Sequence, residues 1–326
     1  MSASSAGFVA IGRNEGARLI ACLKSLRASG GGDIVYVDSG STDQSVAAAT
    51  ELGAKIIALD MSIPFTAARA RNAGARRLID EESPRYIQFV DGDCMLADGW
   101  LETARAFLDD HPEVAVACGR RRERYPEKTL FNRLCDLEWD TPVGEAQACG
   151  GDALIRVEAL VEAGLYNDGL VAGEEPELCV RLRERGWKIW RLGAEMTVHD
   201  AAMTKFSQWW TRAKRAGHAY AEVSALHQGS PQQIWARETR RALMWSAIAP
   251  VSILSALAFG PAFLALLAAY PAQMLRLYLS GRNRLGELAA SWAALTVLGK
   301  FAEAAGVLQF YGGRILGRKS GLFEYK

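Results

Sequence analysis

The chain has 326 residues, of which 50% are hydrophobic and 23% are charged, and its formal net charge is +1. This length predicts one large α/β domain with a further segment, and the balanced charge excludes the broad positive field with which proteins attract nucleic acid. The six cysteines lack C-x-x-C spacing, which favours a reducing compartment, and residues 1–7 lack the basic start of a secretory signal.

The first 200 residues alternate segments typical of strands with segments typical of helices. Apolar runs predict strands, and apolar residues at helical spacing predict helices. Strands are predicted at residues 8–11, 34–37, 55–59, 86–90, 114–118 and 150–155, and helices at 15–28, 67–80, 156–163 and 173–185. This order predicts a Rossmann-like α/β fold with a mostly parallel sheet, helices on both faces and ligands at the carboxyl ends of the strands. The arginines at 120–122 and 124 are predicted to lie in a solvated loop.

Acidic turns follow two of the predicted strands. Asp38–Asp43 (Asp-Ser-Gly-Ser-Thr-Asp) follows the second strand, and Asp91-Gly92-Asp93 follows the fourth. Two carboxylates spaced i, i+2 at a strand end can turn toward one point, as a hard divalent cation requires when it also holds phosphate oxygens. These turns therefore predict a site for a cation and a phosphorylated ligand.

A third acidic cluster opens the helix predicted at 173–185. Glu174, Glu175 and Glu177 all lie in its first turn. Acidic residues suit the positive end of a helix dipole, but three of them repel one another, and a nearby cation would relieve that repulsion. The cluster therefore fits either simple capping or the same cation-dependent site.

The last third of the chain differs in composition. Ala242–Leu275 holds 34 consecutive uncharged residues and is interrupted by Gly260-Pro261, a helix breaker. About 20 apolar residues span a bilayer, and arginines flank this run at positions 237, 240, 241, 276, 282 and 284. Basic flanks at both ends predict a membrane hairpin with both ends in the cytoplasm; a buried soluble hairpin is the alternative.

Two further segments adjoin this hairpin. Residues 206–241 mix Trp209, Trp210 and Tyr220 with basic side chains, which suits a membrane interface or an ordinary amphipathic helix. The apolar stretch at about 288–311 carries Lys300 and Glu303 in its middle. We expect it to lie on the membrane or to pack against the hairpin.

Five motifs, in this order, resemble those of glycosyltransferase family 2, the inverting sugar transferases of GT-A fold, and in particular its membrane-associated members that build exopolysaccharide. The motifs are Asn14-Glu15, Asp38–Asp43, Ala70-Arg71-Asn72-Ala73-Gly74, Asp91-Gly92-Asp93 and Gly173-Glu174-Glu175. The resemblance covers Phe8 to His199. It implies a catalytic domain at 1–205, with a nucleotide-sugar half at about 1–119 and an acceptor half at about 120–205. Residues 242–326 then form the membrane-associated region, with the hairpin at 242–275.

The resemblance implies how the donor is bound. Asp38 would contact the nucleotide base, and Glu15 or Arg71 would help to bind the nucleoside. Asp91 would lie near the ribose and the metal, and Asp93 would coordinate Mg²⁺ or Mn²⁺ bridging the diphosphate of the donor, for which a UDP-sugar is favoured. His199 stands where some members place a further diphosphate or metal contact.

The resemblance also implies a catalytic base and an acceptor region. Glu175 aligns with the catalytic Asp of the family, although the longer Glu side chain leaves Glu174 and Glu177 as alternatives. A carboxylate can take the proton of the attacking hydroxyl, and attack opposite the leaving group inverts the sugar. The loop Trp139–Cys149 is expected to face the acceptor, with Trp139, Gly151 and Asp152 in the acceptor region.

The sequence thus predicts a metal-dependent hexosyltransferase on the cytoplasmic face of the cell membrane. It would move a sugar from a nucleotide-diphospho-sugar to a hydroxyl of a lipid-linked acceptor or a polysaccharide precursor. Two alternatives stay open. A nucleotidyltransferase also pairs aspartates with a metal on an α/β sheet, but usually has a basic Gly-rich loop where Gly12–Gly16 here contains Glu15. A non-catalytic scaffold with a degenerate transferase fold is conceivable because Glu stands at 175.

Overall fold

The computed structural model describes residues 6–317, and the chain divides into two compact units, Met1–Thr204 and Lys205–Lys326. The strands, all in the first unit, are β1 (Ala6–Gly12), β2 (Ile34–Asp38), β3 (Lys55–Ala58), β4 (Tyr86–Asp91), β5 (Cys94–Leu96), β6 (Val114–Glu123), β7 (Gly144–Ala146), β8 (Ala153–Arg156) and β9 (Lys188–His199). The helices of this unit are α1 (Ala17–Ala28), α2 (Ser45–Glu51), α3 (Ala67–Glu82), α4 (Trp100–Asp110), α5 (Leu130–Glu138), α6 (Val157–Glu162) and α7 (Glu174–Glu184), with the 3-10 helix η1 (Pro126–Lys128).

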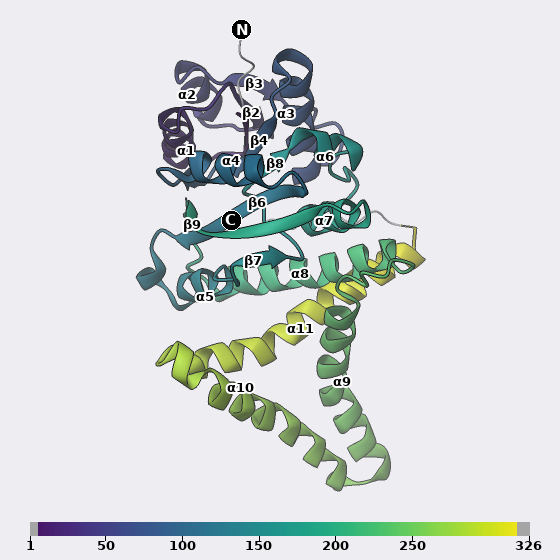
Figure 1. Ribbon diagram of the computed structural model, residues 1–326. Coiled ribbons are helices and arrows are strands. Elements are labelled where there is room, and N and C mark those ends of the chain that lie inside the picture. The colour runs from purple at the N-terminus through teal and green to yellow at the C-terminus, as the bar shows by residue number, and fades with distance from the viewer. Residues whose placement is uncertain (1–5, 318–326) are drawn as a thin grey trace. The chain divides into compact units, whose positions relative to one another are not determined.

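The nine strands form one sheet in the order β3-β2-β1-β4-β8-β6-β9-β5, with β7 also paired to β9 (Figure 1). Strands β3, β2, β1 and β4 are parallel, as predicted. The other half is mixed: β6 and β9 are parallel, but β8 runs antiparallel to both β4 and β6, and β5 and β7 run antiparallel to β9. Parallel neighbours need long crossover connections, which α1, α2 and α3 supply among β1 to β4.

Helices cover both faces of the sheet, as predicted. A Cβ added to Gly7 would lie 3.0 Å from Leu78 of α3, and one added to Gly74 of α3 would lie 2.5 Å from Val9. The next residue, Phe8, points to the opposite face, where it and Leu101 of α4 border Gly31. The core of the unit is therefore two apolar layers, one on each side of the central strands.

The prediction of a solvated loop at the basic run was wrong. Strand β6 continues through these residues to Glu123, and Arg120 is buried. Arg120 forms an ion pair with Asp136 at 3.0 Å and Arg121 one with Asp152 at 2.7 Å. Arginine can end a strand in this way because buried carboxylates neutralise its charge.

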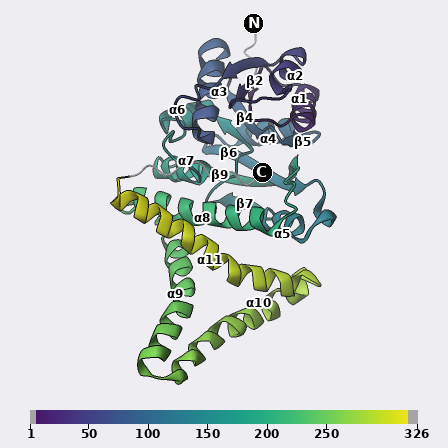
Figure 2. The same ribbon diagram turned by 180° about the vertical axis from the view of Figure 1, so that it is seen from behind.

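The second unit is helical. Its elements are α8 (Phe206–Leu226), α9 (Ala236–Phe259), the 3-10 helix η2 (Pro261–Ala268), α10 (Ala269–Leu285) and α11 (Leu288–Ile315). In Figure 2, α9 and α10 meet at η2, and α11 returns from α10 toward α8. Gly260 ends α9, as the breaker predicted.

Among residues 6–317, three helical segments are long and apolar enough to cross a membrane: Ala236–Phe259, Pro261–Leu285 and Leu288–Ile315. The first two leave large apolar side chains exposed, among them Leu254, Leu257 and Phe259. The third is more covered, and within it Lys300 pairs with Glu303 at 2.6 Å. The two charges that argued against a span at about 288–311 therefore neutralise each other.

A candidate active site at the carboxyl ends of the strands

The turns that follow β1 and β2 are held together by Asn14. Its backbone N–H donates to Ser41 Oγ at 2.9 Å, and its Oδ1 accepts from the backbone N–H of Thr42 at 2.7 Å. Asn14 has a φ of 55°, a conformation that asparagine tolerates better than most residues. The two predicted nucleotide-binding turns are thus neighbours in space.

Asp38 shapes the second of these turns. Its Oδ2 accepts from the backbone N–H of Gly40 at 3.0 Å and of Ser41 at 2.9 Å, and its Oδ1 accepts from Tyr36 Oη at 3.0 Å. Glu15, the other predicted nucleoside contact on this side, forms an ion pair with Arg18 at 2.7 Å. Both carboxylates already have partners within the chain, and Asp38 Oδ1, which accepts one hydrogen bond, keeps a lone pair for a ligand.

Helix α3 positions the acidic end of α7 through Asn72. The buried Asn72 side chain accepts from the backbone N–H of Tyr166 at 3.0 Å and donates to the Tyr166 carbonyl at 2.8 Å and to Asp168 Oδ1 at 2.6 Å. These contacts fix the loop that leads to Gly173, whose φ of 83° starts α7. The neighbouring residues Arg71 and Asn72 therefore have different roles. Asn72 positions the loop before α7, and Arg71 lies in the site itself.

Arg71 connects the Asp-Gly-Asp turn to the acidic end of α7. The buried guanidinium donates to Asp91 Oδ1 at 2.8 Å and to Glu174 Oε1 at 2.6 Å, and it forms an ion pair with Glu175 Oε1 at 3.2 Å. A Cβ added to Gly151 would lie 2.5 Å from Arg71 and 2.9 Å from Asp91. Only glycine leaves room for this cluster.

The three glutamates of α7 have different surroundings. Glu174 is nearly inaccessible and pairs with Arg71, and Glu177 is bound through both carboxylate oxygens by Arg181, one turn later. Glu175 retains 15% of its side-chain exposure. Burial and the neighbouring Glu174 raise its pKa to about 7, although Arg71 opposes the shift. Glu175 is therefore the carboxyl group of this cluster that is both accessible and poised to exchange a proton near neutral pH.

Asp152 and Arg121 form a buried pair beneath the Asp-Gly-Asp turn. Asp152 is fully buried; it accepts from the backbone N–H of Asp91 at 3.0 Å and from Thr197 Oγ1 at 2.7 Å, and it pairs with Arg121. Arg121 also reaches Asp91 Oδ2 at 3.4 Å. The prediction that Asp152 faces an acceptor does not fit this burial, since its carboxylate is inaccessible and already holds three donors of the chain itself.

Arg121 is a site residue that the sequence analysis missed. Its guanidinium carbon lies 5.5 Å from the centre of the Trp139 ring. The available signal was that Arg121 stands shortly after the apolar run 114–118. A run of arginines, however, is typical of a solvated surface. Trp139, predicted near the acceptor, is thus placed at the same edge of the sheet.

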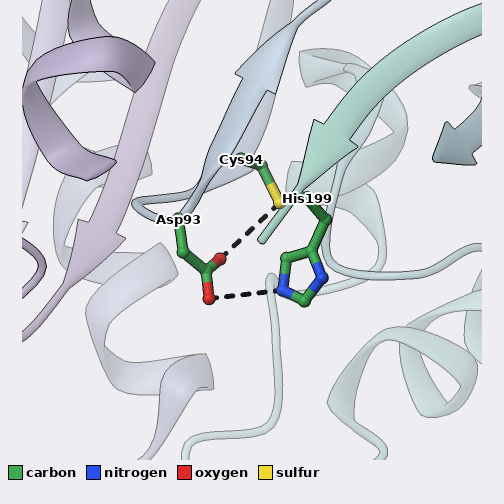
Figure 3. A group of neighbouring side chains, drawn as sticks. All are labelled: Asp93, Cys94 and His199. Carbon is green, nitrogen blue, oxygen red and sulfur yellow. Dashed lines mark hydrogen bonds and ion pairs between the residues drawn. The ribbon is translucent and has the colours of Figure 1, made fainter. Parts of the chain in front are cut away.

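Asp93, in the Asp-Gly-Asp turn after β4, and His199, at the end of β9, lie close together (Figure 3). Their Oδ2 and Nε2 atoms are 3.2 Å apart, and Cys94 Sγ lies 3.6 Å from Asp93 Oδ1. Strands β5 and β9 bring them together, because Cys94 is the register partner of His199. Burial, with Arg121 nearby, lowers the pKa of His199 to about 4, so the imidazole is neutral at physiological pH and keeps a lone pair for a ligand.

Asp93, Cys94 and His199 are close enough to hold one metal ion, and so are Asp91, Cys94 and Asp152. Burial raises the pKa of the Cys94 thiol well above its ordinary value, and a soft sulfur ligand suits Mg²⁺ or Mn²⁺ less than oxygen or imidazole nitrogen does. In the second group Asp152 is already committed to Arg121. The Asp93 carboxylate and the His199 imidazole are therefore the available donors, a pair that accepts Mn²⁺ and similar cations.

Known proteins resemble both the sequence and the fold. Residues 9–152 match the model of the family described as "Glycosyl transferase family 2". The mannosyltransferase PcManGT from Pyrobaculum calidifontis, solved in complex with GDP-Man and Mn²⁺, is similar over 94% of this chain and 87% of its own, with 18% identity and a TM-score of 0.66. S. aureus TarS 1–349 is similar over 96% of this chain and 92% of its own, with 14% identity and a TM-score of 0.51.

The same TarS segment has also been solved with UDP-GlcNAc, and that structure matches with a TM-score of 0.50 and 14% identity, over 96% of this chain and 92% of its own. No curated protein sequence matches the chain. At such identities the likeness to solved structures shows the fold, while the family model matches the residues of the first four strands and of the Asp-Gly-Asp turn. The chain is therefore a glycosyltransferase of GT-A fold, and its residues 9–152 belong to glycosyl transferase family 2.

Proposed function

We propose that this protein transfers a sugar from a nucleotide-diphospho-sugar, with UDP-sugars favoured, to a hydroxyl of a lipid-linked or polysaccharide-precursor acceptor, with inversion. The oxygen of the acceptor attacks the anomeric carbon while the bond to the nucleoside diphosphate breaks. Glu175 accepts the proton of the attacking hydroxyl. The products are the glycosylated acceptor and the nucleoside diphosphate.

The observation that supports this most strongly is the place of Glu175. A single guanidinium, that of Arg71, separates its carboxylate from Asp91 of the Asp-Gly-Asp turn. A general base works best when its pKa lies near the operating pH, and the pKa of Glu175 is raised to about 7 by burial and by Glu174. Glu177 is less suited, because Arg181 occupies both of its oxygens.

The residues at the strand ends fit a divalent cation. Asp93 and His199 present an oxygen and a nitrogen 3.2 Å apart, and His199 Nδ1 is a buried polar atom without a hydrogen-bond partner among residues 6–317. Such an arrangement suits an imidazole that uses its other nitrogen as a ligand. When bound there, Mg²⁺ or Mn²⁺ would stabilise the negative charge of the departing diphosphate.

The donor class is supported by the similar structures. PcManGT was solved with GDP-Man and Mn²⁺, and TarS 1–349 with UDP-GlcNAc; both ligands are nucleoside-diphosphate sugars. In this chain the turn that Asn14 and Asp38 shape would hold the nucleoside. Asp91, between Arg71 and Arg121, would lie near the ribose.

A membrane-borne acceptor is supported by the second unit. Few residues of helix α9 and of the following segment Pro261–Leu285 are buried, and large apolar side chains are exposed on both. Contact of these side chains with water is unfavourable, whereas lipid would cover them. Arginines lie near both outer ends of this pair of segments, at 237, 240 and 241 and at 276, 282 and 284, so we propose a hairpin with both ends on the cytoplasmic face. Helix α11 packs along α8, which carries the basic residues Arg212, Lys214 and Arg215. We therefore place α11 at the interface between membrane and water.

Release of nucleoside diphosphate from a panel of UDP- and GDP-sugars, with Mn²⁺ and acceptor lipids, tests this function. In the wild type the turnover number should rise with pH and level off above about 7, because a base must be deprotonated to act. Glu175→Gln should lower it about 10²- to 10⁴-fold while donor binding persists. Glu158→Gln, an exposed change on α6, is the matched control.

Near-normal turnover in Glu175→Gln, together with a dead Glu174→Gln or Glu177→Gln, would move the base to that neighbour. A wild-type protein that releases no nucleoside diphosphate from any of the donors would contradict the proposed transfer and favour the scaffold alternative.

A further inference from the structure

The imidazole of His199 stands between two carboxylates. On one side Nε2 lies 3.2 Å from Asp93 Oδ2, and on the other Nδ1 lies 3.9 Å from Glu123 Oε2. Glu123 and His199 are register partners where the parallel strands β6 and β9 end. The side chain of Glu123 is completely inaccessible to solvent, so its carboxylate is a fixed part of the wall behind the imidazole.

Neutral donors hold the Glu123 carboxylate in place. Oε1 accepts from the backbone N–H of Tyr125 and from Asn132 Nδ2, each at 3.1 Å, and Oε2 accepts from the backbone N–H of Ala201 at 3.0 Å. Within residues 6–317, His199 is the one basic side chain within 4.0 Å of this carboxylate. A buried carboxylate normally pairs with a cation or a strong donor, and the group it faces here is Nδ1.

The single N–H of a neutral imidazole can serve only one of the two carboxylates. While Nε2 donates to Asp93, Nδ1 is left as an acceptor facing another acceptor, which fits its lack of a hydrogen-bond partner among the described residues. A cation bound to Nε2 would move the proton to Nδ1, where Glu123 can accept it. With a cation on Nε2, both nitrogens of the ring would have a partner, whereas without one Nδ1 has no hydrogen-bond partner among residues 6–317.

We propose that Glu123 is a positioning residue that holds the Nδ1–H of His199 and so presents Nε2 to the divalent cation bound with Asp93. The inference rests on the proposed function, which supplies the cation. Carboxylates in this position fix the tautomer and the ring orientation of a ligating histidine and strengthen it as a ligand, and their loss typically costs about 10- to 100-fold in metal affinity. Nothing in the sequence motifs points to Glu123, which lies among the arginines at the end of β6.

This role is tested by measuring the affinity of the full-length protein for Mn²⁺, in detergent and with UDP present. The EPR signal of free Mn²⁺ gives the amount bound and hence the affinity. Glu123→Gln should weaken binding about 10- to 100-fold, because its amide can donate to Nδ1 and keep the proton of the ring on Nε2. Glu123→Asp retains the charge and should recover part of the affinity. Glu195→Gln on β9, whose half-exposed carboxylate pairs with Arg122, is the matched control and should bind Mn²⁺ normally.

A second measurement needs no change to Glu123 and therefore decides the question even if Glu123→Gln fails to fold. The chain has four histidines, so ¹⁵N NMR of histidine-labelled protein, compared with His199→Gln, identifies the tautomer of His199. With Zn²⁺ and UDP, a diamagnetic pair that accepts imidazole ligands, the proton should be on Nδ1. A proton on Nε2, or unchanged Mn²⁺ affinity in Glu123→Gln, would overturn the role of Glu123.

Asp93→Ala separates this inference from the function on which it rests. Loss of Mn²⁺ binding in Asp93→Ala with normal binding in Glu123→Gln overturns only the positioning role. Unchanged binding in Asp93→Ala shows instead that the cation site itself is wrong.

Discussion

Asp91 and Asp152 share the guanidinium of Arg121, which is 17% exposed and lies beneath the Asp-Gly-Asp turn. Arg121→Gln would leave the fully buried Asp152 without its ion pair, which typically costs about 3–5 kcal/mol. For a domain of this size the midpoint of thermal unfolding should fall by about 6 to 20 °C. Differential scanning fluorimetry of the wild type and the variant measures this shift.

The neighbouring Arg122 is the control for that change. It pairs with Glu195, but both side chains are about half exposed, and exposed ion pairs contribute about 0–1 kcal/mol. Arg122→Gln should therefore leave the midpoint nearly unchanged. Equal shifts in the two variants would mean that Arg121 does not stabilise the buried aspartate.

Individual residues were predictable from the sequence where a motif ties a residue type to a strand end. The two acidic turns, Arg71 and the first turn of α7 all lie at one edge of the sheet, as the βαβ pattern implies. Arg121 and Glu123 were not predictable, because their burial depends on β6 pairing in parallel with β9, about 75 residues later in the chain. The local sequence there is that of an exposed basic segment.

At the scale of elements, α8 and α11 cross at two glycines. A Cβ at Gly306 would collide with the backbone carbonyl of Lys214 and lie 2.6 Å from the backbone nitrogen of His218, and one at Gly217 would collide with the backbone of Glu303. Gly306→Ala must therefore push the two helices apart, which should cost about 1–3 kcal/mol. A lower midpoint in thermal unfolding of the detergent-solubilised protein is the expected result.

Gly312, further along α11, provides a control of opposite sign. A Cβ there has no neighbouring heavy atom within 4 Å, and alanine favours a helix over glycine by about 1 kcal/mol. Gly312→Ala should therefore leave stability unchanged or raise it. If Gly306→Ala behaved in the same way, the close crossing of α8 and α11 would be contradicted.

Most elements could be predicted from periodicity, whereas the second half of the sheet could not. Strands β1, β2 and β4 are buried apolar runs and β3 is a half-buried one, and periodic helices separate them, which favours the parallel arrangement that is found. Strands β5 and β7 have three residues each, too short for an alternating or apolar pattern to stand out. Their pairing with β9 is decided by tertiary contacts that the local sequence does not carry.

At the scale of the whole molecule, the site residues all lie in Met1–Thr204 and the three long apolar helical segments all lie in Lys205–Lys326. A protein truncated after Thr204 should therefore bind UDP with Mn²⁺ as the full chain does, but should appear in the soluble fraction and transfer poorly to a lipid-borne acceptor. Fractionation and calorimetry check these outcomes. A full-length protein that is soluble without detergent would contradict the proposed membrane anchor.

The topology of the anchor can be measured separately. A hairpin of α9 and Pro261–Leu285 predicts that tags placed before Ala236 and after Leu285 are both cytoplasmic. A tag after Leu285 that is accessible from the outside would contradict the hairpin. The sequence suggested this hairpin from charge and length, and it could not suggest that Lys300 and Glu303 neutralise each other on α11.

The central claim is that the carboxyl ends of β4 and β9 hold a nucleoside diphosphate through a divalent cation, and calorimetric titration of UDP and GDP tests it most directly. We predict binding to the wild type that requires Mn²⁺ and is abolished by EDTA. Asp93→Ala should lose this binding and remain folded, whereas Glu175→Gln should retain it. Binding that is independent of Mn²⁺, or equal in Asp93→Ala and the wild type, would contradict the account.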